Sequence, residues 1–539
     1  MGHSAQATSD LHEAQEAAGL ITDAAVRQRS MATLGITEAR MKRSESNAAD
    51  IRNLTSSLEY FQRTGSHFAL AQVLLERGVA HRLTANPELA KADLEMGITE
   101  LESIREQGST EDLRISYFAN GQAVFEELMS LLVSESRPIE ALNIVERARA
   151  RELLEEVARP GSGSANSGSP ASPPEGPLQA GQITARLPTG VVVIEYAVLN
   201  DRLLIWLLRK EGVRFRQVSV SRQRLKESVA DFLDALHHPP GKGGAARDGL
   251  SRILIDPIAE FLGDDELLVF VPDKSLHEVP FAALRSPDRA QYLIEHHEIA
   301  IAPSTTLFLH SATRGRELAG TAEPSILAVG NPSLDPARRS GLGNLPHAEE
   351  EASRLARLFA GSTTLEGAAA TKARFLTLAR LHGFIHFAGH SLVNPRHPQF
   401  SSLLFAADAA TGDTGDLYAY EVASARLHGT SLVFLSACAT AAGPAPAGEG
   451  DLSIGRAFLA SGVPVVIGSL WPIGDLASER LAFEFYRGIS EGRNPGSALR
   501  LAQLAMFHGP DPLLTSPDAW APLELIGGYL PRQPERRSR

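Results

Sequence analysis

Two short apolar runs, each broken by small residues and followed by a reactive side chain, constrain this chain more than any other feature. Residues 383–388 (Gly-Phe-Ile-His-Phe-Ala) end at Gly389 and lead to His390. Residues 431–435 (Ser-Leu-Val-Phe-Leu) end at a Ser-Ala pair and lead to Cys438. Such runs are typical of buried parallel strands that end in loops. Because sites in open α/β sheets form outside the carboxyl ends of the strands, we expect these two side chains to meet there as base and nucleophile.

The lone cysteine narrows the chemistry further. With only Cys438, the chain can form neither an intrachain disulfide nor a multi-cysteine zinc site. A lone cysteine can also be no more than a small buried hydrophobe. Its place at a strand end, with a partnered histidine, favours a nucleophile instead.

A second histidine, His386, precedes His390 by four residues and raises the alternative of a metal site. The helix and the intervening glutamate of a His-Glu-x-x-His motif are both missing, so we interpret His386 as a packed strand residue. The sequence also contains no Gly-x-x-x-x-Gly-Lys phosphate loop and no Gly-x-Ser-x-Gly elbow, which disfavours NTPases and serine hydrolases. We therefore expect no metal and no cofactor.

Composition disfavours several classes of partner. The net charge of −12 gives no general electrostatic drive toward nucleic acid or an anionic membrane, and there is no specific nucleic-acid motif. No apolar run reaches the eighteen or so residues of a membrane-spanning helix, and the N-terminus does not resemble a secretory signal. We expect a cytoplasmic protein without a membrane partner. At about 150 residues per domain, a chain of 539 residues predicts two to four domains.

The N-terminal part of the chain is predicted to be helical. Residues 1–48 are polar and weakly patterned, which predicts either disorder or helix. Residues 49–158 are expected to form about five amphipathic helices, with breaks at 64–66, 84–87, 107–109 and 136–138. In the last of these helices, Leu142, Val145 and Leu153 recur at helical spacing.

Two interpretations of this helical region stay open. Segments 87–90 (Pro-Glu-Leu-Ala) and 138–141 (Pro-Ile-Glu-Ala) look like two starts of one paired-helix unit, although the distance between them exceeds the 34 residues of a regular tetratricopeptide repeat. A short α-solenoid would present a groove to a partner protein. A helical bundle would only brace the next domain.

A linker and an α/β domain follow. Residues 159–182 are rich in Gly, Ser and Pro and cannot bury a core, so we place the linker there. Strands are expected at 191–194 and 203–208, as a hairpin, and at 267–271, 326–329, 383–388, 431–435 and 463–467. Helices are expected at 348–359, 372–381, 452–460 and 476–488. This alternation predicts an α/β sandwich with a largely parallel sheet.

From about residue 185 to 530 the chain resembles the CHAT family, caspase-like domains commonly associated with tetratricopeptide repeats. The matching segments follow in order at 271–273, 280–284, 345–351, 386–390, 435–440, 448–451, 456–464 and 469–472. The histidine precedes the cysteine by some fifty residues, as in caspases, although Ser-Ala-Cys-Ala-Thr replaces their Gln-Ala-Cys motif. The resemblance implies a caspase–hemoglobinase-like α/β/α sandwich, related to separase, over residues 183–532. Its first half, about 183–340, would be degenerate, its second half, about 341–532, catalytic, and the preceding helices of the tetratricopeptide type.

Mapped onto this sequence, the family's catalytic histidine falls on His390 and its nucleophile on Cys438. An ordinary thiol has a pKa near 8.5 and is only a few per cent thiolate at neutral pH; a nearby imidazole raises that fraction and can later protonate the leaving amine. The resemblance implies that the backbone N–H groups of Cys438 and Ser391 bind the oxyanion. Caspases have glycine at the second position. A backbone donor survives the change to serine as long as Ser391 needs no glycine-only dihedrals.

Specificity residues are expected in loops beyond the catalytic strands. Asp475 lies where a separase-like acidic pocket residue would fall, and Glu449 and Asp451 are weaker alternatives. An acidic pocket predicts cleavage after Arg or Lys. The interpretation we favour, which is compatible with a pocket role, is that Asp475 N-caps a helix starting near Leu476.

The sequence therefore predicts a cysteine endopeptidase that cleaves protein substrates with a His390–Cys438 dyad and is regulated by a protein partner at its helical repeats. One alternative is a regulatory scaffold whose caspase-like fold and repeats only bind proteins. That alternative would better suit a chain that lacks the histidine or the cysteine. Another interpretation, acyl transfer to a small substrate, rests on the dyad alone.

Overall fold

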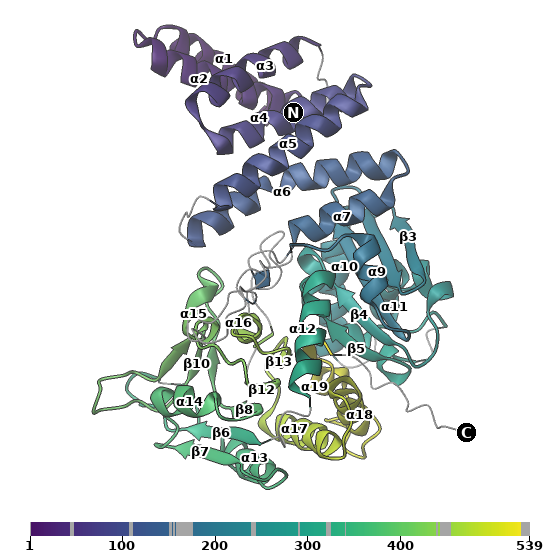
Figure 1. Ribbon diagram of the computed structural model, residues 1–539, viewed down its shortest axis with the longest axis vertical. Coiled ribbons are helices and arrows are strands. Elements are labelled where there is room, and N and C mark those ends of the chain that lie inside the picture. The colour runs from purple at the N-terminus through teal and green to yellow at the C-terminus, as the bar shows by residue number, and fades with distance from the viewer. Residues whose placement is uncertain are drawn as a thin grey trace, which may run out of the picture. The chain divides into compact units, whose positions relative to one another are not determined.

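The computed structural model divides the chain into two compact units, Met1–Ala148 and Arg149–Arg539, which are shown in Figure 1. It describes residues 2–43, 48–106, 111–149, 153–154, 157, 176–238, 244–288, 291–319, 325–339, 341–437, 440–441 and 454–529. The predicted linker, residues 159–182, lies outside the described residues as far as residue 175, and helix α9 (Ala180–Arg186) begins before its predicted end.

The described part of the first unit is entirely helical. Its helices are α1 (Gly2–Gly19), α2 (Ala24–Met41), α3 (Ala48–Thr64), α4 (His67–Leu83), α5 (Pro87–Glu106), α6 (Glu111–Ser134) and α7 (Pro138–Ala148). Of the two alternatives for the N-terminal residues, disorder or helix, α1 and α2 bear out the helix. Each helix contacts the next along the chain, and α4 contacts both α2 and α6. Contacts between neighbouring helices of this kind favour an α-solenoid.

The helices end where the sequence predicts. Gly65, Ala85 and Ser136 have φ values of 68°, 58° and 60°, in the left-handed region that terminates a helix. At the N-terminus of α2, the Asp23 side chain caps the helix by accepting hydrogen bonds from the N–H groups of Ala25 and Val26. The predicted break at 107–109 lies outside the described residues, between α5 and α6.

The second unit is built on a mixed, mostly parallel sheet of eleven described strands in the order β3-β2-β1-β4-β5-β14-β13-β12-β8-β6-β7. The strands are β1 (Val191–Val198), β2 (Leu203–Arg209), β3 (Gly212–Val218), β4 (Leu267–Val271), β5 (Glu298–Ile301), β6 (Ile326–Pro332), β7 (Thr363–Gly367), β8 (Phe384–Ala388), β12 (Leu432–Ser436), β13 (Val465–Ser469) and β14 (Leu523–Gly527). The helices are α9, α10 (Arg222–His237), α11 (Gly244–Leu254), α12 (Thr305–Leu318), α13 (Pro346–Ala356), α14 (Lys372–Ala379), α15 (Ala419–Ala423), α16 (Ile454–Ala460), α17 (Asp475–Ser490), α18 (Pro495–Phe507) and α19 (Pro517–Trp520). An all-α region followed by an α/β sandwich is the predicted fold class, and it is confirmed.

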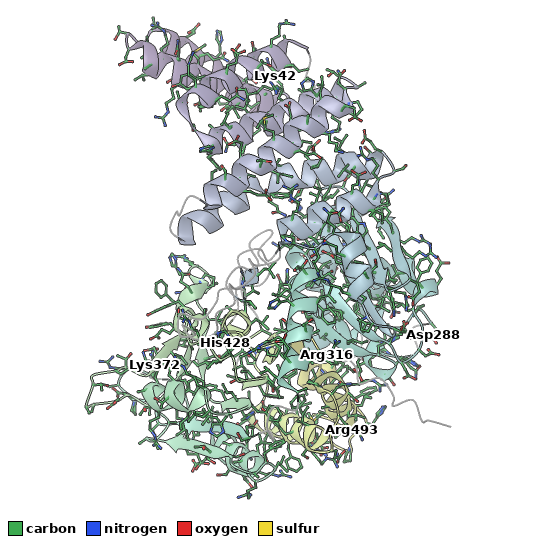
Figure 2. All side chains as sticks on the ribbon, in the orientation of Figure 1. Lys42, Asp288, Arg316, Lys372, His428 and Arg493 are labelled. Atoms are coloured by element: carbon green, nitrogen blue, oxygen red, sulfur yellow. The ribbon has the colours of Figure 1, made fainter. Side chains whose placement is uncertain are left out.

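A second, three-stranded sheet lies beside the end of β8. It consists of β9 (Ser391–Leu392), β10 (Ser402–Leu404) and β11 (Asp416–Tyr418), which pair in antiparallel fashion. Lys372 of α14, labelled in Figure 2, connects the loop before β11 with α15. Its Nζ lies 3.1 Å from both Asp413 Oδ2 and Glu421 Oε1. The sequence did not predict this sheet, because its strands are only two or three residues long.

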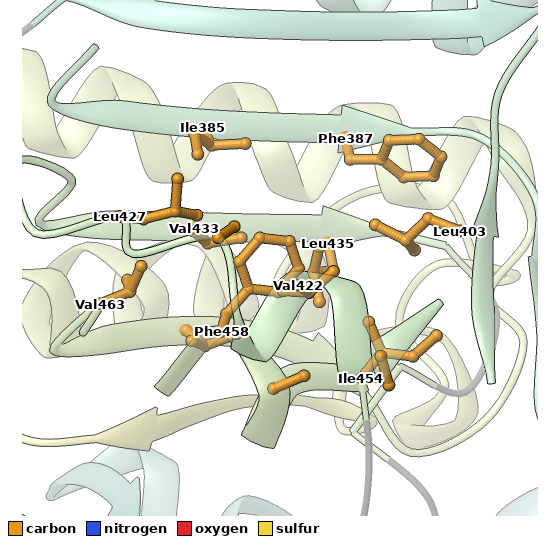
Figure 3. Close-up of a cluster of buried hydrophobic side chains, with 14 of the residues drawn as sticks. Ile385, Phe387, Leu403, Val422, Leu427, Val433, Leu435, Ile454, Phe458 and Val463 are labelled. Atoms are coloured by element: carbon orange, nitrogen blue, oxygen red, sulfur yellow. The ribbon is translucent and has the colours of Figure 1, made fainter. Parts of the chain in front are cut away.

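The two faces of the sheet around β8 and β12 differ in chemistry. Alternate residues of the two strands, including Ile385, Phe387, Val433 and Leu435, join one apolar cluster with residues of α14, α15 and α16 (Figure 3). On the opposite face, His386 lies against Tyr486 of α17, with ring centroids 5.6 Å apart. This alternation follows from the two-residue period of strand side chains, and it gives the sandwich one apolar layer and one partly polar layer.

Strand β14 joins the two halves of the large sheet. It pairs antiparallel with β13 and parallel with β5. The backbone at and just after the end of β14 passes close to other backbone atoms. A Cβ on Gly527, whose φ is 108°, would lie 2.2 Å from the Pro464 carbonyl oxygen, and a Cβ on Gly528 would lie 2.2 Å from the Phe308 carbonyl oxygen. Glycine is therefore required where the strand passes its neighbours.

The second unit begins earlier in the chain than the predicted linker. Leu153 is 0% exposed and belongs to the same apolar cluster as Phe387. Arg149 is buried as well, and its Nη1 lies 3.3 Å from Glu195 Oε1. The helical spacing that groups Leu153 with the preceding helix is thus misleading, because α7 ends at Ala148 and Leu153 packs in the α/β unit. Among the described residues, no helix is long and apolar enough to cross a bilayer.

Replacing Leu153 with alanine should therefore destabilise the α/β unit. We expect Leu153→Ala to lower its free energy of unfolding by about 2–4 kcal/mol, the usual cost of truncating a buried leucine. Hydrogen exchange of the β8 and β12 amides in the full chain measures this effect. Leu381→Ala, at a position that is 72% exposed, is the control and should change little. Faster exchange confined to α7 would contradict the assignment.

Candidate functional site

His390 lies just beyond β8, with its ring held from one side. Its Nε2 is 2.7 Å from the carbonyl oxygen of Gly343, in the loop before α13. A carbonyl can only accept a hydrogen bond, so this contact assigns the proton of the neutral ring to Nε2. The basic lone pair then lies on Nδ1. His390 is partly exposed, as a residue that exchanges protons with a substrate needs to be.

The register of the sheet brings the two predicted strand ends to the same level. β8 and β12 are parallel neighbours, in which Ala388 lies opposite Ser436. His390 follows Ala388 by two residues, and Cys438 follows Ser436 by two residues. Cys438 itself lies outside the described residues, as do Glu449 and Asp451. The strands that lead to the predicted dyad therefore end side by side, as the sequence predicts.

A small pocket of about 80 Å³ opens at this edge of the sheet. Its lining includes residues from the ends of β8, β12 and β13 and from the starts of α13 and α17: Ala348, Gly389, His390, Ser436, Ala437, Ser469, Asp475 and Ser478. Ala437 is the residue directly before Cys438. The pocket thus joins the predicted base, the segment that precedes the predicted nucleophile, and one predicted specificity residue.

Ser391 begins β9 and lies opposite Leu403 of β10. It is not among the described non-glycine residues with positive φ. The serine therefore occupies a backbone conformation open to any residue, which is the condition for its N–H to replace that of the glycine found in caspases.

Asp475 is placed differently from our favoured interpretation. The N-cap of α17 is Gly474, and Asp475 is the first residue of the helix. The prediction that Asp475 caps the helix is therefore wrong by one position: the helix starts a residue earlier than expected. A carboxylate in the first turn still interacts favourably with the helix dipole. Asp475 lines the pocket together with His390, so the predicted pocket position is compatible with the structure.

His386 is a packed strand residue, as expected, but it has a charged neighbour. The side chain is 0% exposed, and its Nε2 lies 3.0 Å from Oε1 of Glu351 on α13, which is 1% exposed. Among the described residues, no group of three or more His, Cys, Asp or Glu side chains could hold a metal ion. No role of Glu351 is predicted from the sequence, although Ala348, Glu351 and Leu355 recur at helical spacing and place it on the buried face of α13.

The first half of the sheet carries a buried acid just beyond a strand end as well. Asp273 follows β4, and its Oδ2 accepts a hydrogen bond of 2.7 Å from the Val198 N–H and lies 3.2 Å from Lys274 Nζ. Burial alone would raise the pKa of Asp273, but Lys274, Arg149 and the Val198 N–H outweigh that effect and lower it. This carboxylate ties β4 to the end of β1. Because β14 runs parallel to β5 but antiparallel to β13, the carboxyl end of β4 lies at the sheet edge opposite to that of His390.

A protein-family model described as the CHAT domain matches residues 246–528, more than half of the sequence. The chain belongs to the CHAT-domain family. The match runs from α11 to just beyond β14 and therefore contains His390 and the whole pocket. It confirms the resemblance that the sequence motifs carry.

Curated relatives of this CHAT-domain chain include tetratricopeptide repeat protein 28 of Mus musculus, 30% identical in an alignment 307 residues long that covers 49% of this chain and 12% of that protein. The Homo sapiens protein of the same name is 29% identical over 303 residues, with the same shares. The matched part of this chain thus spans about an eighth of the length of these relatives.

Solved structures similar to the CHAT-domain chain include a Saccharomyces cerevisiae separase–securin complex, with a TM-score of 0.48 and 10% identity over 98% of this chain and 48% of that one. Another is the Arg-specific cysteine proteinase gingipain R, with a TM-score of 0.34 and 12% identity over 56% of this chain and 75% of that one.

The geometry around His390 predicts an activated thiol in this CHAT domain. We expect Cys438 to react with iodoacetamide at pH 7 about tenfold faster than an ordinary thiol, because an imidazole base raises the thiolate fraction well above a few per cent. His390→Ala should remove this acceleration. His397→Ala, in an exposed loop nearby, is the matched control and should not. With one cysteine in the chain, the rate reports a single site. An ordinary thiol profile in the wild type would contradict a formed dyad.

Proposed function

We propose that this CHAT-domain protein is a cysteine endopeptidase that uses Cys438 as nucleophile and His390 as base. One observation carries the proposal: the ring of His390, with Nε2 facing the Gly343 carbonyl, shares a pocket with Ala437 and Asp475. A neutral imidazole held in this tautomer offers Nδ1 as proton acceptor, and Ala437, the residue before the only cysteine, lines the same pocket.

The proposed reaction has two halves. The thiol proton of Cys438 passes to Nδ1 of His390, and the thiolate attacks the carbonyl carbon of the peptide bond. The backbone N–H groups of Cys438 and Ser391 bind the oxyanion of the tetrahedral intermediate. When this intermediate collapses, the C–N bond breaks, the imidazolium protonates the leaving amine, and a thioester remains. Water, deprotonated by the same imidazole, then hydrolyses the thioester and releases the acid and the free thiol.

The residue before the scissile bond is proposed to be Arg or Lys. Asp475 is the one described acidic residue in the lining of the pocket. A half-buried carboxylate can bind a guanidinium or ammonium group by charge-assisted hydrogen bonds. The helical unit is proposed to bind a protein partner that regulates the site, as its array of neighbouring helices suggests. A cytoplasmic location stays a prediction from the sequence.

Cys438→Ala should abolish peptide cleavage without unfolding the chain. The test uses the full chain with a fluorogenic peptide carrying arginine before the scissile amide. The loss should exceed about a thousandfold, because removing a nucleophile leaves only binding and oxyanion stabilisation. Circular dichroism controls for folding. Cleavage retained in this variant would sink the proposal. A wild type that cleaves no peptide and shows an ordinary thiol would favour the scaffold alternative.

Asp475→Asn should change selectivity rather than chemistry. We expect kcat/KM for the arginine peptide to fall by roughly 10- to 100-fold, since a charge-assisted hydrogen bond contributes about 1.5–3 kcal/mol. A matched peptide with leucine in place of arginine serves as the control and should lose nothing. An equal loss for both peptides would show that Asp475 supports the site without reading the substrate.

A further inference from the structure

A buried acid with no assigned role lies beneath the proposed site. Glu351 Oε1 is 3.0 Å from His386 Nε2, at hydrogen-bonding distance but outside hydrogen-bonding angles, so the contact is electrostatic rather than a directed bond. Both side chains are almost wholly buried. Replacing such a pair with apolar residues is often neutral or stabilising in proteins. Stability alone is therefore a poor reason for a carboxylate at this place.

The other oxygen of Glu351 leads toward the pocket. Oε2 accepts a hydrogen bond of 3.3 Å from the Ser436 hydroxyl at the end of β12. The Ser436 oxygen lies 2.6 Å from that of Ser478 on α17. Because a hydroxyl has one hydrogen, Ser436 donates to Glu351 and Ser478 must donate to Ser436. The hydrogen bonds thus run in one direction, from α17 through β12 to a carboxylate on α13 that can only accept.

These three elements are the ones that carry the proposed site. Ser436 stands two residues before Cys438, and Ser478 stands three residues after Asp475. The loop that precedes α13 supplies Gly343, which faces His390. Both serines also line the pocket. The network of Glu351, Ser436 and Ser478 therefore connects the segments that bear the nucleophile, the pocket acid and the acceptor for the base.

We infer that Glu351 is a positioning residue, which through Ser436 and Ser478 holds the end of β12 and the first turn of α17 in the geometry that the reaction needs. This role rests on the proposed function of the same site. In this proposal the carboxylate acts through Ser436 and not on the substrate. It holds Ser436 at the end of β12, two residues before Cys438, and its other oxygen lies 3.0 Å from His386 Nε2.

Hydrogen exchange on the full chain tests the holding of these segments. In Ser478→Ala and in Glu351→Gln, amides at 435–437 and 476–478 should exchange roughly fivefold faster, the effect of one lost hydrogen bond on local opening. Thr430→Val is the matched control, since it removes a buried hydroxyl beyond the opposite end of β12, whose oxygen lies 3.2 Å from the Ala379 carbonyl oxygen and 3.1 Å from that of His382. It should leave both segments unchanged. The inference would be overturned if both variants kept the wild-type exchange rate in these two segments. This outcome does not depend on whether the protein cleaves peptides.

Kinetics separate positioning from simple loss of stability. For the arginine peptide, Ser478→Ala should lower kcat roughly tenfold with KM within about twofold, because the defect lies in the geometry of attack and not in binding. The pH profile of Cys438 alkylation should shift toward that of an ordinary thiol, and Thr430→Val should leave it in place. Faster exchange with unchanged kcat and alkylation would reduce the network to a structural brace. A wild type without peptidase activity would refute the proposed function, while exchange would still decide whether Glu351 holds these segments.

Discussion

The in-register pairing of β8 with β12 is the constraint on which the rest of the site depends. His386 lies opposite Phe434, and Ala388 lies opposite Ser436, so the two strands end side by side at the same edge of the sheet. A slip of one residue would exchange the two faces of a strand. His386 would then enter the apolar layer, and Phe387 would leave it. Because both faces are buried, the register is strongly specified, and with it the distance between the two strand exits.

The different chemistry of the two layers follows from this pairing. The layer with α14, α15 and α16 is apolar and supplies the burial that stabilises the fold. The layer with α13 and α17 contains the polar groups, and the loops and first turns of these helices approach the pocket. Both faces are buried, since Phe434, Phe485 and Leu355 of the second layer are also 0% exposed. The buried polar groups near the pocket, such as Glu351 and His386, lie in that second layer.

The sequence predicts features that depend on neighbouring residues better than features that depend on contacts distant in the chain. Strands such as β4, β8 and β12 are continuous apolar runs and were predicted, whereas the edge strand β3 alternates with charged residues and β14 contains a glutamate, so neither was. Local preference favours aspartate at a helix N-cap and therefore predicts Asp475 as the N-cap of α17, but the N-cap is Gly474. The role of Gly343 could not be read at all, since any residue offers a carbonyl and only the fold brings this one to His390. For Leu153, the helical spacing predicts burial among the N-terminal helices, but the side chain packs in the core of the α/β unit.

Strand β14 has a consequence for how the protein is made. It is translated after every other described strand, yet it lies in the middle of the large sheet, between β13 and β5. Until it inserts, the two halves cannot form one sheet, and the pocket lacks the wall that Leu523 provides. During synthesis the pocket is therefore completed only after this central strand has emerged from the ribosome.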